Sequence, residues 1–218
     1  ALCSNQTGVN NVAVGADALI KNTAQRNTAV GMSALVCNTT GQQNVAIGYF
    51  SLDDNTTGGC NVAIGGGMGL NSTGSDNIAI GSGALANNQT CSNNVAVGHS
   101  AAQETNSAHG ITAIGALALC KNTSGDNNTA IGTCSLICNT TGFSNVAVGV
   151  CSLFNNNTGQ ENTAIGFKAG IATTTACGIT AVGMCALHNH TTGGDNNAVG
   201  MCSQFSTTTG AANNSMGH

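Results

Sequence analysis

A single short motif recurs along the whole chain, and this repeat constrains the fold more than any other feature. Each copy reads Asn-x-Ala-(Val or Ile)-Gly, with small departures in a few copies. The spacing of its glycines is constant, except that the intervals from Gly15 to Gly31 and from Gly65 to Gly81 are shorter by a single residue. The anchoring glycines are Gly15, Gly31, Gly48, Gly65, Gly81, Gly98, Gly115, Gly132, Gly149, Gly166, Gly183, Gly200 and Gly217. Because the pattern runs from end to end, we expect residues 1–218 to form one repeat domain without a separate cap, stalk or anchor.

The length and chemistry of the repeat favour β-structure. Helix-turn-helix repeats need more than about 30 residues, and this period is much shorter. The repeat instead carries β-branched residues that favour strands, and an Asn-Thr-Thr-Gly segment typical of a turn. We therefore predict an all-β parallel solenoid, or β-roll, of about 13 coils. Each coil should contain two short strands and two turns, and coils should stack about 4.8 Å apart.

Strand periodicity assigns the side chains to two faces. Residues one and three before the anchor Gly should share a face, and the Ala and the Gly should share the other. We expect the branched column to be buried and to meet Leu residues from the second strand: Leu19, Leu35, Leu52, Leu85, Leu119, Leu136, Leu153 and Leu187. The branched column is Val14, Val30, Ile47, Ile64, Ile80, Val97, Ile114, Ile131, Val148, Ile165, Val182 and Val199.

Composition excludes several classes of protein. Four Lys and Arg residues in the whole chain cannot cover a phosphate backbone, so nucleic-acid binding is not expected. No apolar run approaches the roughly 18 residues that a membrane-spanning helix needs, so we expect no membrane insertion. The sequence lacks G-x-S-x-G, H-E-x-x-H and P-loop motifs, and its eight acidic residues are scattered. Adjacent Asp53 and Asp54 should point apart in a charged loop. We predict no enzymatic activity, no catalytic residues, no cofactor and no metal site.

The repeat resembles a known family of surface fibres. Asn44-Val45-Ala46-Ile47-Gly48 and Asn77-Ile78-Ala79-Ile80-Gly81 resemble the YadA-type head repeat of trimeric autotransporter adhesins. The longer unit, with its Ala-Leu and Asn-Thr-Thr-Gly segments, is similar to repeats of phage tail fibres. The resemblance covers residues 10–217. It implies a left-handed β-roll, a homotrimer around one axis, and an extracellular or surface-exposed location on a cell, filament or virion.

Cysteine is abundant, with eleven residues, which favours an oxidising compartment. Cys134, Cys151, Cys185 and Cys202 each lie two residues after an anchor Gly, on two pairs of adjacent coils. Equivalent residues about 4.8 Å apart fall within the Cα range of a disulfide. We predict the bonds Cys134–Cys151 and Cys185–Cys202, with Cys120–Cys138 as a weaker pair. Free, buried thiols are the alternative.

The turns hold two further kinds of candidate residue. Asn-x-(Ser or Thr) sequons make glycosylation conceivable, although Asn and Thr are also ordinary turn formers, and we favour that interpretation. The sequon residues are Asn38, Asn55, Asn71, Asn88, Asn122, Asn139, Asn156 and Asn189. His188 and His190 lie two residues apart and could face the same way toward a metal, but a solvated turn is the favoured interpretation. His99 and His109 are expected on the surface.

These features predict a structural or adhesive fibre. Its self-association, as a homotrimer or end to end through open terminal coils, would use the repeat itself, and glycans or extracellular matrix are its candidate ligands. A single-chain rod stapled by disulfides is the alternative to the trimer. A ligand-binding or ice-binding solenoid is the second hypothesis, based on threonines at Thr39, Thr56 and Thr73 and at Thr40 and Thr57. A receptor-binding segment of a viral or phage fibre is a further alternative.

Overall fold

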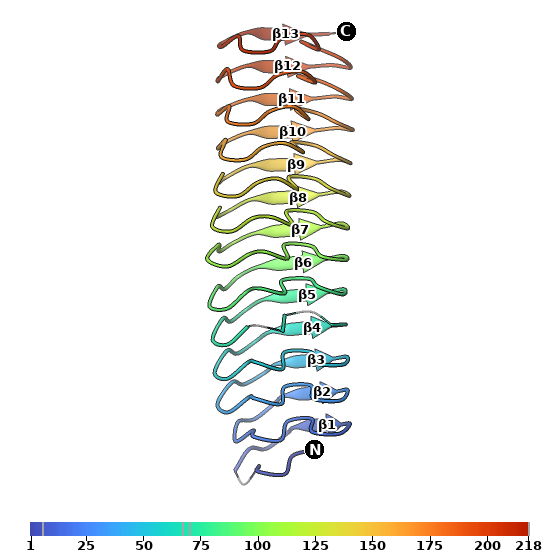
Figure 1. Ribbon diagram of the computed structural model, residues 1–218, viewed down its shortest axis with the longest axis vertical. Helices are drawn as coiled ribbons and strands as arrows, with labels where there is room; N and C mark the ends of the chain where they lie inside the picture. Colours follow the sequence, from blue (N-terminus) through green and yellow to red (C-terminus); the bar gives the residue numbers. More distant parts are fainter. Residues whose placement is uncertain (6, 67, 70, 218) are drawn as a thin grey trace.

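The protein forms a single stack of parallel strands (Figure 1). The computed structural model describes residues 1–5, 7–66, 68–69 and 71–217. These residues contain strands and turns, and no helix long and apolar enough to cross a membrane. The strands are β1 (Val12–Val14), β2 (Thr28–Val30), β3 (Val45–Ile47), β4 (Val62–Ile64), β5 (Ile78–Ile80), β6 (Val95–Val97), β7 (Thr112–Ile114), β8 (Thr129–Ile131), β9 (Val146–Val148), β10 (Thr163–Ile165), β11 (Thr180–Val182), β12 (Asn197–Val199) and β13 (Asn214–Met216).

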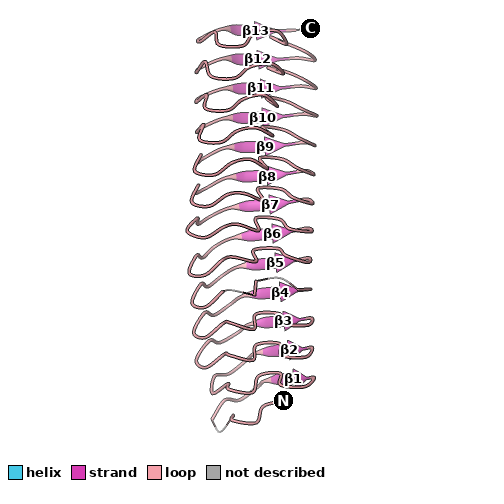
Figure 2. Cartoon of the chain, in the orientation of Figure 1, coloured by secondary structure: helices cyan, strands magenta, loops and turns pink. Residues whose placement is uncertain are grey.

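The strands follow one another in sequence order, and each pairs in parallel with the next. Equivalent residues are aligned, as where Ala147 of β9 lies opposite Ala164 of β10. Loops and turns make up the rest of every coil (Figure 2). This confirms the predicted all-β parallel solenoid, in which each sequence repeat contributes one coil to the stack.

The two faces of the strands are reversed relative to the prediction. The central Ala of β2 to β12 has no exposed surface. The branched column points outward: 57% of Val14, 38% of Ile47 and 41% of Ile165 is exposed, and no residue of that column is buried. The prediction of a buried Val/Ile column from Val14 to Val199 is therefore wrong. The interior of the coil is so narrow that the strand contributes only a methyl group to it.

The Leu column is buried, as predicted, but it does not lie on a second strand. Each of these leucines is fully buried, and each has a left-handed backbone, with φ between 48° and 54°. The residue two after the anchor Gly is also left-handed, as at Cys151, with φ of 56°. Alternating left-handed residues cannot form an extended strand. The expected second strand is therefore replaced by a succession of turns, which fold each Leu back against the Ala column.

Two ladders of buried Asn side chains close the opposite edge of each coil. In the first ladder, Asn55 Nδ2 donates to Asn38 Oδ1 at 2.8 Å and to the Gly58 carbonyl at 3.0 Å. In the second, the backbone N–H of Asn44 donates to Asn27 Oδ1, on the preceding coil, at 2.9 Å. The first ladder comprises Asn22, Asn38, Asn55, Asn71, Asn88, Asn122, Asn139 and Asn156, and the second comprises Asn27, Asn44, Asn61, Asn77, Asn94, Asn128, Asn145, Asn162 and Asn196. Where the ladders are continuous, each turn is thereby bonded to the next through its side chains.

Both ladders are interrupted at two coils by a concerted replacement, and His190 replaces one further Asn of the first ladder. The sets Thr105-Ala108-Ile111 and Thr173-Ala176-Ile179 replace Asn, Gly and Asn at equivalent positions. A Cβ added at Gly142 would clash with the Gly159 carbonyl of the next coil and with Asn139 Oδ1, so glycine makes room for both. The amide oxygens of Asn88 and Asn156, which face the interruptions, are left without a hydrogen-bond partner.

Candidate interaction surface

The outward side of the stacked strands forms one continuous surface along the molecule. We define the outer strand face as the first and third residues of β1 to β13. All of them are half-buried or exposed, and none is charged. They are Val, Ile and Thr up to β11, with Asn at the start of β12 and β13 and Met216 at the end of β13. Their side chains form two parallel rows, and each row repeats at the spacing of the strands, about 4.8 Å.

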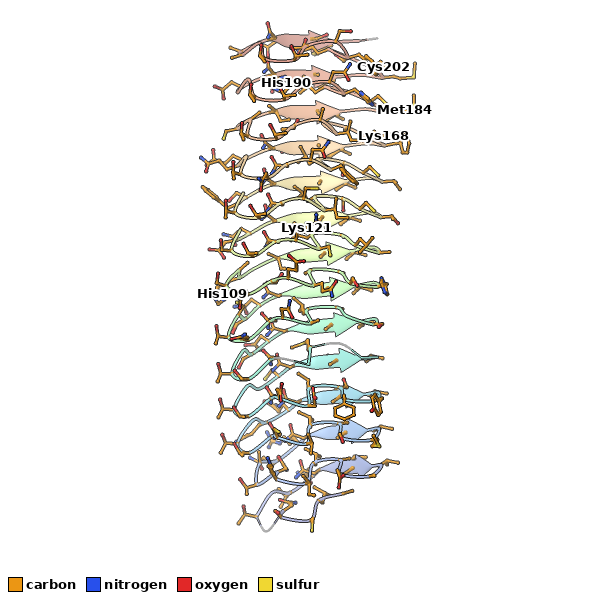
Figure 3. All side chains as sticks on the ribbon, in the orientation of Figure 1. His109, Lys121, Lys168, Met184, His190 and Cys202 are labelled. Carbon is orange, nitrogen blue, oxygen red and sulfur yellow. The ribbon has the colours of Figure 1, made fainter. Side chains whose placement is uncertain are left out.

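Further apolar side chains extend this face around the edge where the chain leaves each strand. The residue after the anchor Gly is a large, exposed apolar residue in several coils: Met32, Tyr49, Val150, Phe167, Met184 and Met201. Tyr49 packs edge-on against Phe50, with ring centroids 4.3 Å apart. Figure 3 places Met184 at this edge of the stack. Exposed apolar surface of such extent is unusual for a monomer and typical of an interface. This surface was not expected from the sequence, because the branched column was predicted to lie inside the coil.

The structure forms none of the predicted disulfides. All eleven cysteines, including Cys134, Cys151, Cys185 and Cys202, are free thiols. In-register turns hold equivalent Cβ atoms about 4.8 Å apart, whereas a disulfide needs about 3.5–4.5 Å. Burial raises the pKa of the Cys134 thiol, and the neighbouring Cys151 thiol raises it further.

The weaker pair, Cys120 and Cys138, is out of register. The N–H of Lys121 donates to the carbonyl of Ile137, and the N–H of Cys138 to that of Phe154. This hydrogen bonding aligns Cys120 with Ile137 and aligns Cys138 with Lys121. Burial raises the pKa of the Cys120 thiol, with a smaller increase from Glu104.

Seven of the eight sequon residues are inaccessible. The side chains of Asn38, Asn55, Asn71, Asn88, Asn122, Asn139 and Asn156 are fully buried in the first Asn ladder. An amide that is buried and hydrogen-bonded cannot carry a glycan in this fold. Glycosylation at these positions is therefore contradicted, whereas Asn189 is exposed and stays available. The favoured interpretation of Asn as a turn former agrees with the structure. The ladder gives a further reason why Asn recurs, because each Asn side chain bonds to a neighbouring coil.

The two neighbouring histidines face different environments. His190 is fully buried at a position of the first Asn ladder, and its Nε2 contacts the Gly193 carbonyl at 2.5 Å. The expectation of a solvated turn is therefore wrong for His190. His188 stacks on Phe205, with ring centroids 4.6 Å apart. His99 and His109 are exposed, as expected.

No catalytic arrangement emerges from the described residues. Within that part of the chain, no group of three or more His, Cys, Asp and Glu side chains is placed to hold a metal ion. A hollow of about 380 Å³ is lined by Asn87, Gln89, Glu104, Asn106 and Thr123, with Glu104 as its one ionisable group. Asp53 and Asp54 lie in a turn, where burial and then the Asp54 charge raise the pKa of Asp53.

Comparison with known proteins gives no relative. No protein-family model, no curated protein and no solved structure matches this chain.

Proposed function

We propose that this protein is a non-enzymatic, extracellular or surface-exposed fibre component that self-associates through its outer strand face. The observation that carries the proposal is the continuity of that face, which is apolar or hydroxylated and uncharged from β1 to β11. The extracellular location and adhesive role rest on the resemblance to adhesin heads and tail fibres. The proposal differs from the sequence-based expectation in one respect. The coils are joined by backbone bonds and Asn ladders, with no need for disulfide staples.

A second copy of this chain is the partner that best fits the face. Its rows of β-branched side chains repeat about every 4.8 Å along the stack. Another surface can interlock with them over many coils only if it has the same repeat, as in the dry interfaces between stacked sheets. A copy of the same chain supplies that repeat. It also brings no unpaired charge into the interface, because the face contains none. A trimer satisfies the same conditions by arranging three such faces around one axis.

The test is to measure the oligomeric state by sedimentation equilibrium over a range of concentrations. We expect a stable oligomer. The resemblance to adhesin heads implies that it contains three chains. The double variant Ile114→Lys/Ile131→Lys places two charges at adjacent positions that are 39% and 37% exposed. Desolvation of these charges should shift the protein to monomer. A wild-type chain that stays monomeric at every concentration would refute the proposal.

A matched control places the same charges elsewhere. Thr141 and Thr158 are exposed on adjacent coils, in the turns that hold the Asn ladders. Thr141→Lys/Thr158→Lys should leave the oligomer intact. If both double variants dissociate equally, association does not depend on the outer strand face. Electron microscopy with mass per unit length then distinguishes discrete rods from filaments extended end to end.

Ice binding is a second candidate, because threonines lie on the outer strand face. Thr28, Thr112, Thr129, Thr163 and Thr180 each begin a strand, and their side chains are half-buried beside the Val/Ile row. The threonines in the turns, on which the ice-binding hypothesis first rested, have another role: Thr39 and Thr56 donate their hydroxyls to the carbonyls of the next coil. Thermal hysteresis that is abolished by Ile114→Lys/Ile131→Lys would favour ice binding. No hysteresis at high concentration would exclude it.

A further inference from the structure

Four cysteines and one lysine occupy a single column over five consecutive coils. The column consists of Cys134, Cys151, Lys168, Cys185 and Cys202, all with φ of 56° or 57°. The same backbone conformation gives their Cα–Cβ bonds the same direction. The cysteines are half-buried, so their thiols are accessible from solvent. Figure 3 shows Lys168 and Cys202 toward the edge of the stack where the strands end. The column therefore presents two pairs of neighbouring thiols, separated by an ammonium group.

The spacing within each pair suits a bridging metal ion better than a disulfide. The N–H of Cys202 donates to the Met184 carbonyl at 2.8 Å, which holds the two turns in direct contact beside the thiols. Equivalent atoms of adjacent coils are about 4.8 Å apart. Two metal–thiolate bonds, each taken at the length of about 2.3 Å known for zinc–thiolate bonds, span about 4.6 Å when collinear. When both side chains adopt the same rotamer, their sulfurs share the spacing of the coils, and a two-coordinate ion then fits between them with little movement of the turns. A disulfide would instead require the two Cβ atoms to approach each other.

Thioethers distinguish one pair from the other. Met184 and Met201 immediately precede Cys185 and Cys202, and both methionines are exposed. The equivalent residues beside Cys134 and Cys151 are Thr133 and Val150. Thiolates and thioethers are soft ligands that select Cu(I) over harder cations. Four sulfur-bearing side chains on two adjacent turns are thus concentrated at the second pair.

We propose that Cys185 and Cys202 bind one Cu(I) ion as a two-coordinate bis-thiolate site, with Met184 and Met201 as thioethers beside it. Each thiol loses its proton on coordination, so binding one Cu(I) releases two protons and involves no change of oxidation state. The site needs only two ligands, and it is therefore compatible with the absence of any convergent group of three His, Cys, Asp or Glu side chains in the described residues. The bound ion would link two adjacent coils across their turns.

The experiment titrates the reduced protein anaerobically with Cu(I) in competition with a chromogenic Cu(I) chelator. We expect Cys185→Ser/Cys202→Ser to bind one Cu(I) fewer per chain than the wild type. Cys37→Ser/Cys60→Ser is the matched control, because these two cysteines lie in different columns, and it should retain the full number. An equal number of bound ions in the wild type and Cys185→Ser/Cys202→Ser would overturn the proposal. Circular dichroism verifies that both variants keep the fold.

Three further measurements test the site itself. X-ray absorption of Cys134→Ser/Cys151→Ser loaded with one equivalent should show sulfur neighbours only, and a site dominated by nitrogen or oxygen would overturn the proposal. Met184→Leu/Met201→Leu should weaken binding about tenfold without changing the number of ions, and an unchanged affinity would overturn the role of the thioethers. A Cys185–Cys202 disulfide found by mass spectrometry in protein isolated without reductant would also overturn the site.

Discussion

Individual residues in this fold are selected by backbone conformation and by the close approach of the next coil. The anchor Gly149 has φ of 130°, a region that L side chains rarely adopt. A Cβ built there would lie 2.5 Å from the carbonyl oxygen of Gly166, the anchor of the following coil. The recurrence of glycine at this position therefore has two causes. The turn requires a positive φ, and the backbone of the next coil leaves no space for a Cβ.

Gly149→Ala should lower the free energy of unfolding by about 2–5 kcal/mol, because backbone strain and a steric clash with fixed backbone atoms add together. Gly66→Ala is the control, since nothing lies within 4 Å of the added Cβ and no positive φ is required there. It should change stability by no more than about 0.5 kcal/mol. Urea denaturation of both variants measures the difference, and equal effects would contradict this account of the anchor.

At the scale of the element, the turn with its pair of Asn ladders behaves as one unit. Asn139 Nδ2 donates to Asn122 Oδ1 and to the Gly142 carbonyl, both at 2.8 Å, and Asn156 Nδ2 donates to Asn139 Oδ1 at 2.9 Å. The native coil that contains Thr105, Ala108 and Ile111 shows that the set can be exchanged as a whole. We therefore expect the three positions to be coupled, although Cys91 shows that the Gly position also changes alone, between Asn88 and Asn94.

Asn139→Ala should cost about 2–4 kcal/mol, because it leaves buried amide groups on the neighbouring coils without partners. The triple variant Asn139→Thr/Gly142→Ala/Asn145→Ile reproduces the native alternative set. We expect it to cost less than the sum of the three single substitutions. Thermal unfolding of the three single variants and the triple variant measures this coupling, and additivity within error would show that the positions act independently.

The sequence predicts the topology well, but not the direction in which the strands face. The regular period and the Asn-Thr-Thr-Gly turns correctly indicate parallel coils, and the Leu column is buried as expected. Hydrophobicity alone favours burying Val and Ile over Ala. For this reason the Val/Ile column, and not the Ala column, was predicted to line the interior. A better signal is variation in size: the branched position accepts both Val and Ile, whereas Ala29 to Ala198 are identical in every coil. The left-handed Leu residues have no sequence signal, since Leu ordinarily avoids that conformation.

At the scale of the whole molecule, the coils are interchangeable because each contacts mainly its two neighbours. Deleting residues 133–149 removes one complete period and joins Gly132 to Val150, which keeps every column in register. We expect a folded protein about 4.8 Å shorter, with a smaller denaturant dependence of unfolding. Deleting only residues 133–140 should abolish cooperative folding, because it would leave one coil about half its length. Small-angle scattering and urea titration test both outcomes.

The two shortened intervals show how the stack tolerates an error in length. Between Gly15 and Gly31 the residue is missing after Asn22, and between Gly65 and Gly81 it is missing before Asn71. Both flanking strand pairs are nevertheless aligned residue for residue, Val12 with Thr28 and Val62 with Ile78. A defect is thus absorbed within the coil where it occurs and is not transmitted along the axis. Misalignment does not accumulate with length, so repeated gain or loss of coils, even imperfect ones, can change how far the protein reaches without redesign of its interior.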